Sequence, residues 1–138
     1  MVTYWDASAL IPLLLKEATS ESHRRAARDA GIVTWWGSYV ECASAIARRE
    51  REGSAPEQVA EARRLLDALG REWREIGPSD QLRRTALRAL RTHVLRASDA
   101  LHIAAALVTS GFEPHSVQFR TEDRRLMAAA EREGFAVD

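Results

Sequence analysis

Short β-prone runs alternate along the chain with longer segments in which apolar residues recur at helical spacing. Five runs are rich in β-branched and aromatic residues and are predicted as strands: VTYW (2–5), IVTWW (32–36), EWREI (72–76), VQFRT (117–121) and FAV (135–137). The sequence contains no internal repeat, low-complexity tract or interdomain linker. The pattern therefore predicts a single domain, residues 1–138, in which strands and helices alternate.

The segments between the runs carry the start and stop signals of helices. Ser38 followed by Glu41 fits a capping box, and several segments end at a glycine, as helices commonly do. The predicted helices cover Ser8 to about Lys16, 20–30, Ser38 to Gly53, 56–69, 80–93, Ser98 to about Ser110, and 123–133. Strands separated by helices favour right-handed crossovers with helices on both sheet faces. We therefore expect a three-layer α/β/α sandwich around a parallel sheet of about five strands.

Composition narrows the class of protein without identifying it. Hydrophobic residues make up 46% of the 138 residues and charged residues 29%, which is ordinary for a domain that buries its own core. No apolar run approaches the roughly 20 residues that cross a membrane. The N-terminal apolar patch lacks a basic flank and is interrupted by Asp6, so it does not resemble a signal peptide. The single cysteine, Cys42, excludes an internal disulfide and a cysteine-cluster metal site, and we expect a cytoplasmic protein.

The charge balance argues against a broad DNA-binding surface. The chain has 20 basic and 20 acidic residues and a formal net charge of zero, whereas non-specific DNA binders carry an extended cationic face. Lys16 is the only lysine, a bias that we attribute to genome base composition rather than to phosphate binding.

Four acidic residues fall where a parallel α/β sheet places its ligands, at the carboxyl ends of the strands. Asp6 lies just past the first predicted strand, Glu41 in the first turn after the second, and Asp123 just past the fourth. Asp99 stands at the start of the apolar helix that should pack on the sheet. Each position also suits an acid that only caps a helix or interacts with its dipole, and this structural reading stands beside the functional one.

Carboxylates gathered at one edge of a sheet would repel one another, and this repulsion would raise some of their pKa values. A hard divalent cation removes that cost, and Mg²⁺ or Mn²⁺ prefers oxygen ligands. The four acids therefore predict a site for one or two such cations.

The segments around these acids resemble the PIN-domain ribonucleases, and in particular the toxins of VapBC-type toxin–antitoxin pairs. The matching pieces are YWDASAL, SYVECASAIARR, LRASDALHIAAAL and FRTEDRRLMAAAEREGFAV, and the ordered set spans essentially the whole chain. By this resemblance, Asp6, Glu41, Asp99 and Asp123 form an acidic site that binds Mg²⁺ or Mn²⁺. The fold of the family, a parallel five-stranded sheet between helices, agrees with the pattern above.

The resemblance also implies roles for neighbouring residues. Ser8 and Thr121 stand where family members often carry a hydroxyl group that helps to hold a metal-bound water. Glu122 adds an acid next to Asp123 and could contribute instead, but the T-x-D-x-x-L spacing favours Asp123. His102 follows Asp99 by one helical turn, and it could act as a ligand or catalyst, pack in the core, or support a neighbour by a hydrogen bond.

The activity implied by the resemblance is metal-dependent hydrolysis of RNA. Attack by water would leave 5′-phosphate and 3′-hydroxyl ends, and the metal would lower the pKa of that water and stabilise charge at phosphorus. The implied partners are the RNA substrate, a second copy of the chain in a homodimer, and a cognate VapB-like antitoxin that obstructs the acidic site. Contact with DNA would be indirect, through the antitoxin, and no membrane is involved.

Arginine and tryptophan residues near the acids each have two possible roles. Arg96, just before the acidic helix, is an ordinary surface arginine or meets a phosphate or a partner. Trp35 and Trp36 adjoin the second strand, and we expect one of them to face the core while the other supports a dimer interface or stacks on a base.

Three alternative functions are weighed against the toxin. A PIN-like binding module would keep the fold without the activity, and a housekeeping RNA-processing nuclease would lack the antitoxin. A small upstream gene for a basic DNA-binding protein would favour the toxin over the latter. A receiver-like signalling domain also gathers acids and Mg²⁺, but it would need an Asp closing the third strand and a lysine near the last one. Here the third strand ends in Ile76-Gly77-Pro78, and Lys16 lies in the first helix.

Overall fold

A five-stranded parallel sheet forms the centre of the fold. The computed structural model describes residues 1–137. The strands are β1 (Val2–Trp5), β2 (Val33–Trp35), β3 (Arg74–Ile76), β4 (Val117–Arg120) and β5 (Ala136–Val137). All neighbouring pairs run parallel, in the order β3-β2-β1-β4-β5. The five-stranded parallel sheet predicted from the sequence is therefore confirmed.

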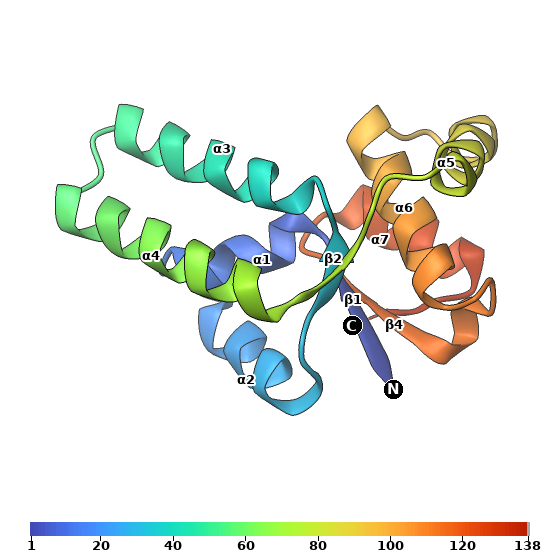
Figure 1. Cartoon of the computed structure of the whole chain (residues 1–138), viewed down its shortest axis with the longest axis horizontal. Coiled ribbons are helices and arrows are strands. Elements are labelled where there is room, and N and C mark those ends of the chain that lie inside the picture. The colour runs from blue at the N-terminus through green and yellow to red at the C-terminus, as the bar shows by residue number, and fades with distance from the viewer. Residues whose placement is uncertain (138) are drawn as a thin grey trace.

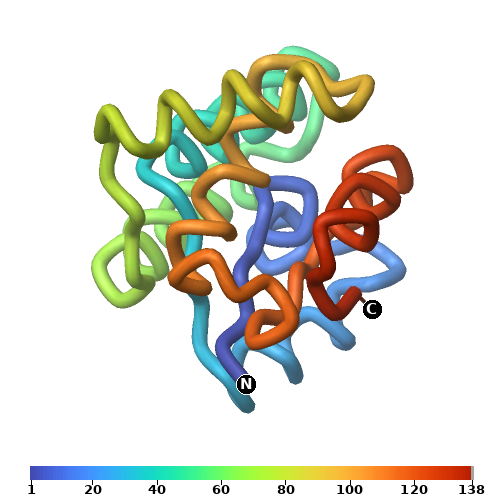
Figure 2. The backbone as a smooth tube through the Cα atoms, turned by 90° about the vertical axis from the view of Figure 1, so that its right-hand side faces the viewer, coloured from blue at the N-terminus to red at the C-terminus, as the bar shows by residue number. Residues whose placement is uncertain are grey.

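Helices cover both faces of this sheet, which confirms the three-layer sandwich. One face carries α1 (Ala7–Leu14), α2 (Ser20–Ala30), α3 (Ser38–Arg51) and α4 (Pro56–Glu72), and the other carries α5 (Asp80–Thr92), α6 (Ala97–Thr109) and α7 (Arg124–Glu133) (Figure 1). A single 3₁₀ turn, Pro114–Ser116, precedes β4. Figure 2 turns α5, α6 and α7 toward the viewer, where they lie across the strands.

The sheet separates two apolar cores because side chains alternate between its faces. In β1, Tyr4 packs in the core beneath α5, α6 and α7, and Trp5 packs in the core beneath α1, α3 and α4. Tyr4, Trp5, Phe119 and Ile103 are completely buried. Three of the four residues of β1 are buried, as is usual when both faces of a parallel sheet are covered, whereas Arg74 and Glu75 of the edge strand β3 are exposed.

The order of the strands places a topological switch at β1. The chain adds β2 and β3 on one side of β1 and then returns to add β4 and β5 on the other. The connections therefore leave the carboxyl ends of β1 and β4 in opposite directions, which opens the crevice where such sheets bind ligands. Trp5 pairs with Arg120, so Asp6 and Thr121 follow side by side.

The predicted helices are present, and several of their ends differ from expectation by one to three residues. The first helix begins at Ala7 with Asp6 as its N-cap, rather than at Ser8, because the Asp6 carboxylate accepts a hydrogen bond from the backbone of Ala9. It ends at Leu14, two residues earlier than predicted. The fourth helix continues through Gly70 to Glu72, because the Tyr39 ring packs against Gly70, where it would lie 2.8 Å from an added Cβ atom.

The capping box predicted at Ser38 and Glu41 is also wrong. Gly37 is the N-cap of α3 and Ser38 is its first residue, with no side-chain hydrogen bond to the helix end. The Ser38 hydroxyl group instead lies 2.6 Å from the Thr34 hydroxyl group in the core. Glu41 therefore does not cap the helix, and it lies in the first turn of α3, which follows β2.

No helix within residues 1–137 is both long enough and apolar enough to cross a membrane.

Substitution of Ile103 measures how much the core beneath α6 contributes to the stability of the fold. Its side chain is completely buried. We expect Ile103→Ala to lower the free energy of unfolding by about 2–5 kcal/mol, and Ile103→Val by about 0.5–1.5 kcal/mol. Denaturation in urea, followed by circular dichroism, measures both values. Equal losses in the two variants would show that the β-branched methyl groups kept in valine contribute nothing, which would contradict this prediction.

Candidate functional site

Asp6 lies at the centre of the candidate site, at the end of β1. Its carboxylate is buried and accepts hydrogen bonds from the Ser8 hydroxyl group at 2.8 and 3.0 Å, from the Thr121 hydroxyl group at 3.0 Å and from the Ala9 backbone at 3.2 Å. Burial raises the pKa of Asp6, although the charge of His102 and these hydrogen bonds act in the opposite direction. The carboxylate is therefore held in one orientation in a place that disfavours its negative charge.

The turn after β4 is tied to Asp6 by the same two hydroxyl groups. Ser8 accepts a hydrogen bond from the Glu122 backbone at 2.8 Å, and Thr121 accepts one from the Asp123 backbone at 3.0 Å. Ser8 and Thr121 thus connect the start of α1 to the start of α7. Asp123 is the N-cap of α7, and its Oδ1 accepts hydrogen bonds from the backbone of Arg125 and Leu126.

Arg96 brings Asp99 and Asp123 to the same place. Asp99 is the third residue of α6 rather than its cap, and its side chain is buried. The Arg96 guanidinium lies 3.5 Å from Oδ2 of Asp99 and 3.7 Å from Oδ2 of Asp123. The Arg96 backbone also donates to Oδ2 of Asp99 at 3.3 Å. The two carboxylates therefore share the positive charge of one guanidinium group, that of Arg96.

A buried chain of hydrogen bonds places Glu41 beside Asp6. His102, one turn after Asp99, contacts the Glu41 carboxylate through Nε2 at 2.9 Å and the Tyr4 hydroxyl group through Nδ1 at 2.8 Å. Both ring nitrogens of His102 therefore have a hydrogen-bond partner, Glu41 at Nε2 and Tyr4 at Nδ1. Burial, together with the charges of Asp6 and Glu41, raises the pKa of Tyr4, so its hydroxyl group keeps its proton.

These contacts join all four predicted acids in one network. Thr121 links Asp6 to the start of the Asp123 helix, Arg96 links Asp123 to Asp99, and His102 lies between Asp6 and Glu41. Asp6 and Asp99 are buried, whereas the side chains of Asp123 and Glu41 are about one third exposed, at 30% and 32%. Asp6 and Asp99 thus form the buried part of the network, and Asp123 and Glu41 form the part that solvent reaches.

Glu122 lies outside this network. Its carboxylate contacts Nε2 of His23 on α2 at 2.7 Å. Burial acts to raise the pKa of Glu122, but hydrogen bonds to Thr19 and His23 and the charges of His23 and Arg120 outweigh it and lower that pKa. The buried Arg120 also donates to Nδ1 of His23 at 2.9 Å and lies over the Trp5 ring. Glu122 therefore fastens α2 to the end of β4, and Asp123 is the acid that faces Arg96.

Cys42 lies next to Glu41 but has no reactive thiolate. Burial, together with the charges of Glu41 and Asp6, raises its pKa to about 12. The residue is completely buried and packs in the core beneath α1 and α4. A thiol in this setting is a packing residue, because the nucleophilic form is the thiolate.

The donor set suits a hard divalent cation. Within residues 1–137, no three His, Cys, Asp or Glu side chains form a group already able to hold a metal ion. The four acids nevertheless offer only oxygen donors, and the space between Asp99 and Asp123 already accommodates a guanidinium charge. A cation would also offset the cost of burying the Asp6 carboxylate. Asp6, Glu41, Asp99 and Asp123 are therefore the residues that would hold Mg²⁺ or Mn²⁺.

Two hollows flank the acids. The first, of about 630 Å³, lies between α1 and α3 and includes Glu41 in its lining. The second lies beyond Ser8 and Glu122, and Ile11 lines both of them. A further hollow, of about 490 Å³, lies between α5 and α6 and contains none of the four acids. A ligand held at the acids could therefore extend along α1 in either direction.

Sequence reasoning missed two parts of the arrangement. The role of Tyr4 depends on which face of β1 meets α6, and the short strand run gives no signal of that. The position of Arg96 between Asp99 and Asp123 depends on how α6 approaches α7, although its place just before the acidic helix marked it as a candidate.

Comparisons with known proteins establish the fold and leave the family open. The sequence matches no model of a known protein family, and no curated protein matches it. The crystal structure of PAE2754 from Pyrobaculum aerophilum superposes with a TM-score of 0.67 at 21% sequence identity, over 99% of this chain and 89% of that chain. Identity this low supports a shared α/β/α fold and nothing finer.

The buried carboxylate of Asp6 predicts a pH dependence of stability. Its pKa in the folded chain is raised above the ordinary value of 3.8, so its stabilising contribution is full below pH 3.8 and is lost as the pH rises through the raised pKa. We therefore expect Asp6→Asn to raise the melting temperature at pH 7 in EDTA, by an amount that shrinks as the pH falls. Differential scanning calorimetry between pH 4 and pH 8 measures this difference.

Glu122→Gln is the matched comparison for Asp6→Asn. Because the pKa of Glu122 is lowered, its contribution is present above the ordinary value of 4.5 and is lost as the pH falls through the lowered pKa. We expect Glu122→Gln to lower the melting temperature at pH 7. A lower melting temperature for Asp6→Asn as well would contradict the predicted cost of the buried charge.

Proposed function

We propose that the chain is a Mg²⁺- or Mn²⁺-dependent endoribonuclease that acts at the acidic site. The observation that carries the proposal is the gathering of four carboxylates at the switch point of a parallel sheet, with Asp6 buried and held by two hydroxyl groups. The resemblance of the surrounding segments to PIN-domain ribonucleases supports the same activity.

In this proposal, the acidic residues would hold the cation, and their hydrogen-bond partners would fix the orientation of the carboxylates. A divalent cation bound here would lower the pKa of a water molecule and neutralise the charge that develops at phosphorus. Ser8 and Thr121 fix the Asp6 carboxylate, and His102 fixes that of Glu41. Attack by water in line with the leaving 3′-oxygen would give 5′-phosphate and 3′-hydroxyl ends.

Cleavage of a mixed RNA pool tests this proposal. We expect cuts with 5′-phosphate ends in Mg²⁺ or Mn²⁺ and none in EDTA. Asp6→Asn and Asp99→Asn should each lower the cleavage rate by at least about 100-fold, because each removes a carboxylate that would hold the cation that stabilises the transition state. Sequencing of the new RNA ends and a time course of cleavage measure both effects.

Glu122→Gln is the control, since it removes a neighbouring carboxylate that faces His23. It should retain the wild-type rate. If the folded wild-type chain neither cleaves RNA nor binds Mn²⁺ in a calorimetric titration, the nuclease proposal fails and a binding module remains. Equal losses in Glu122→Gln and Asp99→Asn would show that the acids act through stability alone.

The proposal extends to the toxin of a toxin–antitoxin pair in the cytoplasm, with a homodimer and a VapB-like antitoxin as partners. An apolar surface on α5 and the segment that directly follows it, named here the α5 surface, supports a protein contact. The side chains of Leu87, Leu90 and Val94 are 53%, 40% and 86% exposed, and the two leucines line the hollow between α5 and α6. Apolar residues this exposed and this close together mark interaction surfaces.

The α5 surface predicts the effect of added charge on self-association. We expect wild-type protein to sediment as a dimer and the double variant Leu87→Lys, Leu90→Lys to sediment as a monomer, because lysine ammonium groups cannot be buried unpaired. Gln81→Lys adds one lysine at an exposed position of α5 outside this apolar surface and should remain dimeric. Analytical ultracentrifugation measures both, and a monomeric wild type would leave the surface to the antitoxin.

A further inference from the structure

We propose that the hollow beside Glu41 is a nucleobase subsite, in which one base of a single-stranded RNA stacks on Trp36 while Arg48 contacts the backbone phosphate. This inference rests on the proposed function, since it names how the substrate is held next to the acids. Nothing in the resemblance assigns either residue a role.

The hollow is continuous with the acidic site. It is formed by Ala7 and Ile11 of α1 and by Trp36, Val40, Glu41 and Arg48 at and along α3. Its volume of about 630 Å³ is within the range of small-ligand sites, which is roughly 300–1,000 Å³. Glu41 belongs both to the acidic site and to the lining of this hollow. An RNA strand with one phosphate at the acids would therefore have its neighbouring nucleotide in the hollow.

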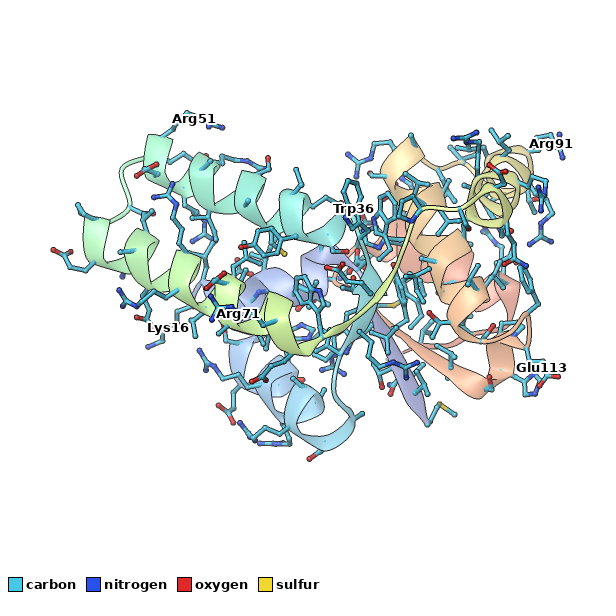
Figure 3. All side chains as sticks on the ribbon, in the orientation of Figure 1. Lys16, Trp36, Arg51, Arg71, Arg91 and Glu113 are labelled. Atoms are coloured by element: carbon cyan, nitrogen blue, oxygen red, sulfur yellow. The ribbon has the colours of Figure 1, made fainter. Side chains whose placement is uncertain are left out.

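Trp36 offers an accessible aromatic face on a rigid support. Its side chain is 56% exposed, and Figure 3 shows it where α3 begins, between α3 and α6. Its backbone N–H donates to the carbonyl oxygen of Ile76 at 2.9 Å, which fixes the residue to β3. The ring of Trp35 lies 6.3 Å away at 69°, and it supports Trp36 from the core side.

Gly37 makes this support possible. A Cβ atom at residue 37 would lie 2.3 Å from Cζ2 of Trp35, so only glycine lets the Trp35 ring pack against the start of α3. The Trp35 ring therefore packs closely against the segment that carries the exposed indole of Trp36. A base can stack on it whatever its identity, because every base has a π-face.

Arg48 supplies the positive charge at the other end of the hollow. It lies seven residues after Glu41 on the same face of α3, or about 10 Å along the helix axis. Among the described residues it forms no ion pair, whereas its neighbour Arg49 pairs with Glu17 at 2.8 Å. A guanidinium without an acidic partner is suited to a phosphate oxygen, which it can bind through two donors.

The charge pattern favours a nucleotide over a protein segment as the occupant. The hollow has an apolar and aromatic middle, a cation without a partner at one end and a candidate metal site at the other. A polynucleotide strand presents this same sequence of groups, with a base flanked by two phosphates. The apolar surface of α5, by contrast, offers a contact for a protein partner elsewhere.

Binding of a single-stranded RNA hexamer of mixed sequence tests the subsite. The titration is followed by tryptophan fluorescence in EDTA, so that no metal-dependent cleavage consumes the probe. Trp5 and Trp73 are buried and Trp35 is half-buried, so quenching reports mainly on Trp36. We expect Trp36→Ala, measured by fluorescence anisotropy of a labelled hexamer, to weaken binding by about 5- to 100-fold, and Trp36→Phe to retain most of it.

Arg48→Gln tests the phosphate contact separately. It should reduce the slope of log K against log salt concentration by about 0.7, because one fewer phosphate is neutralised. Arg51→Gln is the matched control, since Arg51 is exposed at the far end of α3 (Figure 3) and does not line the hollow. Its slope should equal that of the wild type.

The outcomes separate this subsite from the proposed activity. RNA binding that depends on Trp36 in a protein that never cleaves would keep the subsite and overturn the nuclease. Cleavage with wild-type affinity in Trp36→Ala would keep the nuclease and overturn the subsite. A shift of Trp36→Ala from dimer to monomer in the ultracentrifuge, with RNA affinity unchanged, would assign the surface to a second copy of the chain and overturn the subsite.

Discussion

The burial of the Asp6 carboxylate is the constraint on which the site depends. The residue ends β1, caps α1 and meets the turn after β4, so three elements of the fold converge on one charged group. Two hydroxyl groups and a backbone N–H compensate part of the cost of burying it, and the remaining cost keeps its pKa raised. A bound cation, as proposed for this site, would offset that remaining cost.

The other acids are arranged around Asp6 by supports that differ in rigidity. Asp99 is carried by α6, whose following residues are almost completely buried, so its position is set by the core. Glu41 is held by the buried pair Tyr4 and His102. Arg96, by contrast, is exposed and contacts its carboxylates at 3.5 and 3.7 Å. The site thus combines carboxylates held by buried neighbours with an exposed positive charge.

Helix α3 connects the acids to the surface beside them. It presents Glu41 near its first turn and Arg48 two turns later, while Trp36 precedes it on a backbone bonded to β3. One rigid helix therefore sets the distance between the proposed site of cleavage and the proposed contact with the next phosphate. Placing both on a regular element gives better geometric control than a loop provides.

The sequence by itself determined the alternation of strands and helices, the parallel sheet and the candidate acids. Strand runs, helix-ending glycines and an apolar helix are local patterns, and a parallel sheet collects whatever follows its strands at one edge. It misjudged the first residue of the first helix and the roles of Ser38 and Gly70, because a hydroxyl group or a glycine near a helix end has several local partners and only packing selects among them. Tertiary structure alone decided which acid next to Thr121 faces Arg96, and that Tyr4 reaches His102, because those contacts join residues on different elements that are distant in the sequence.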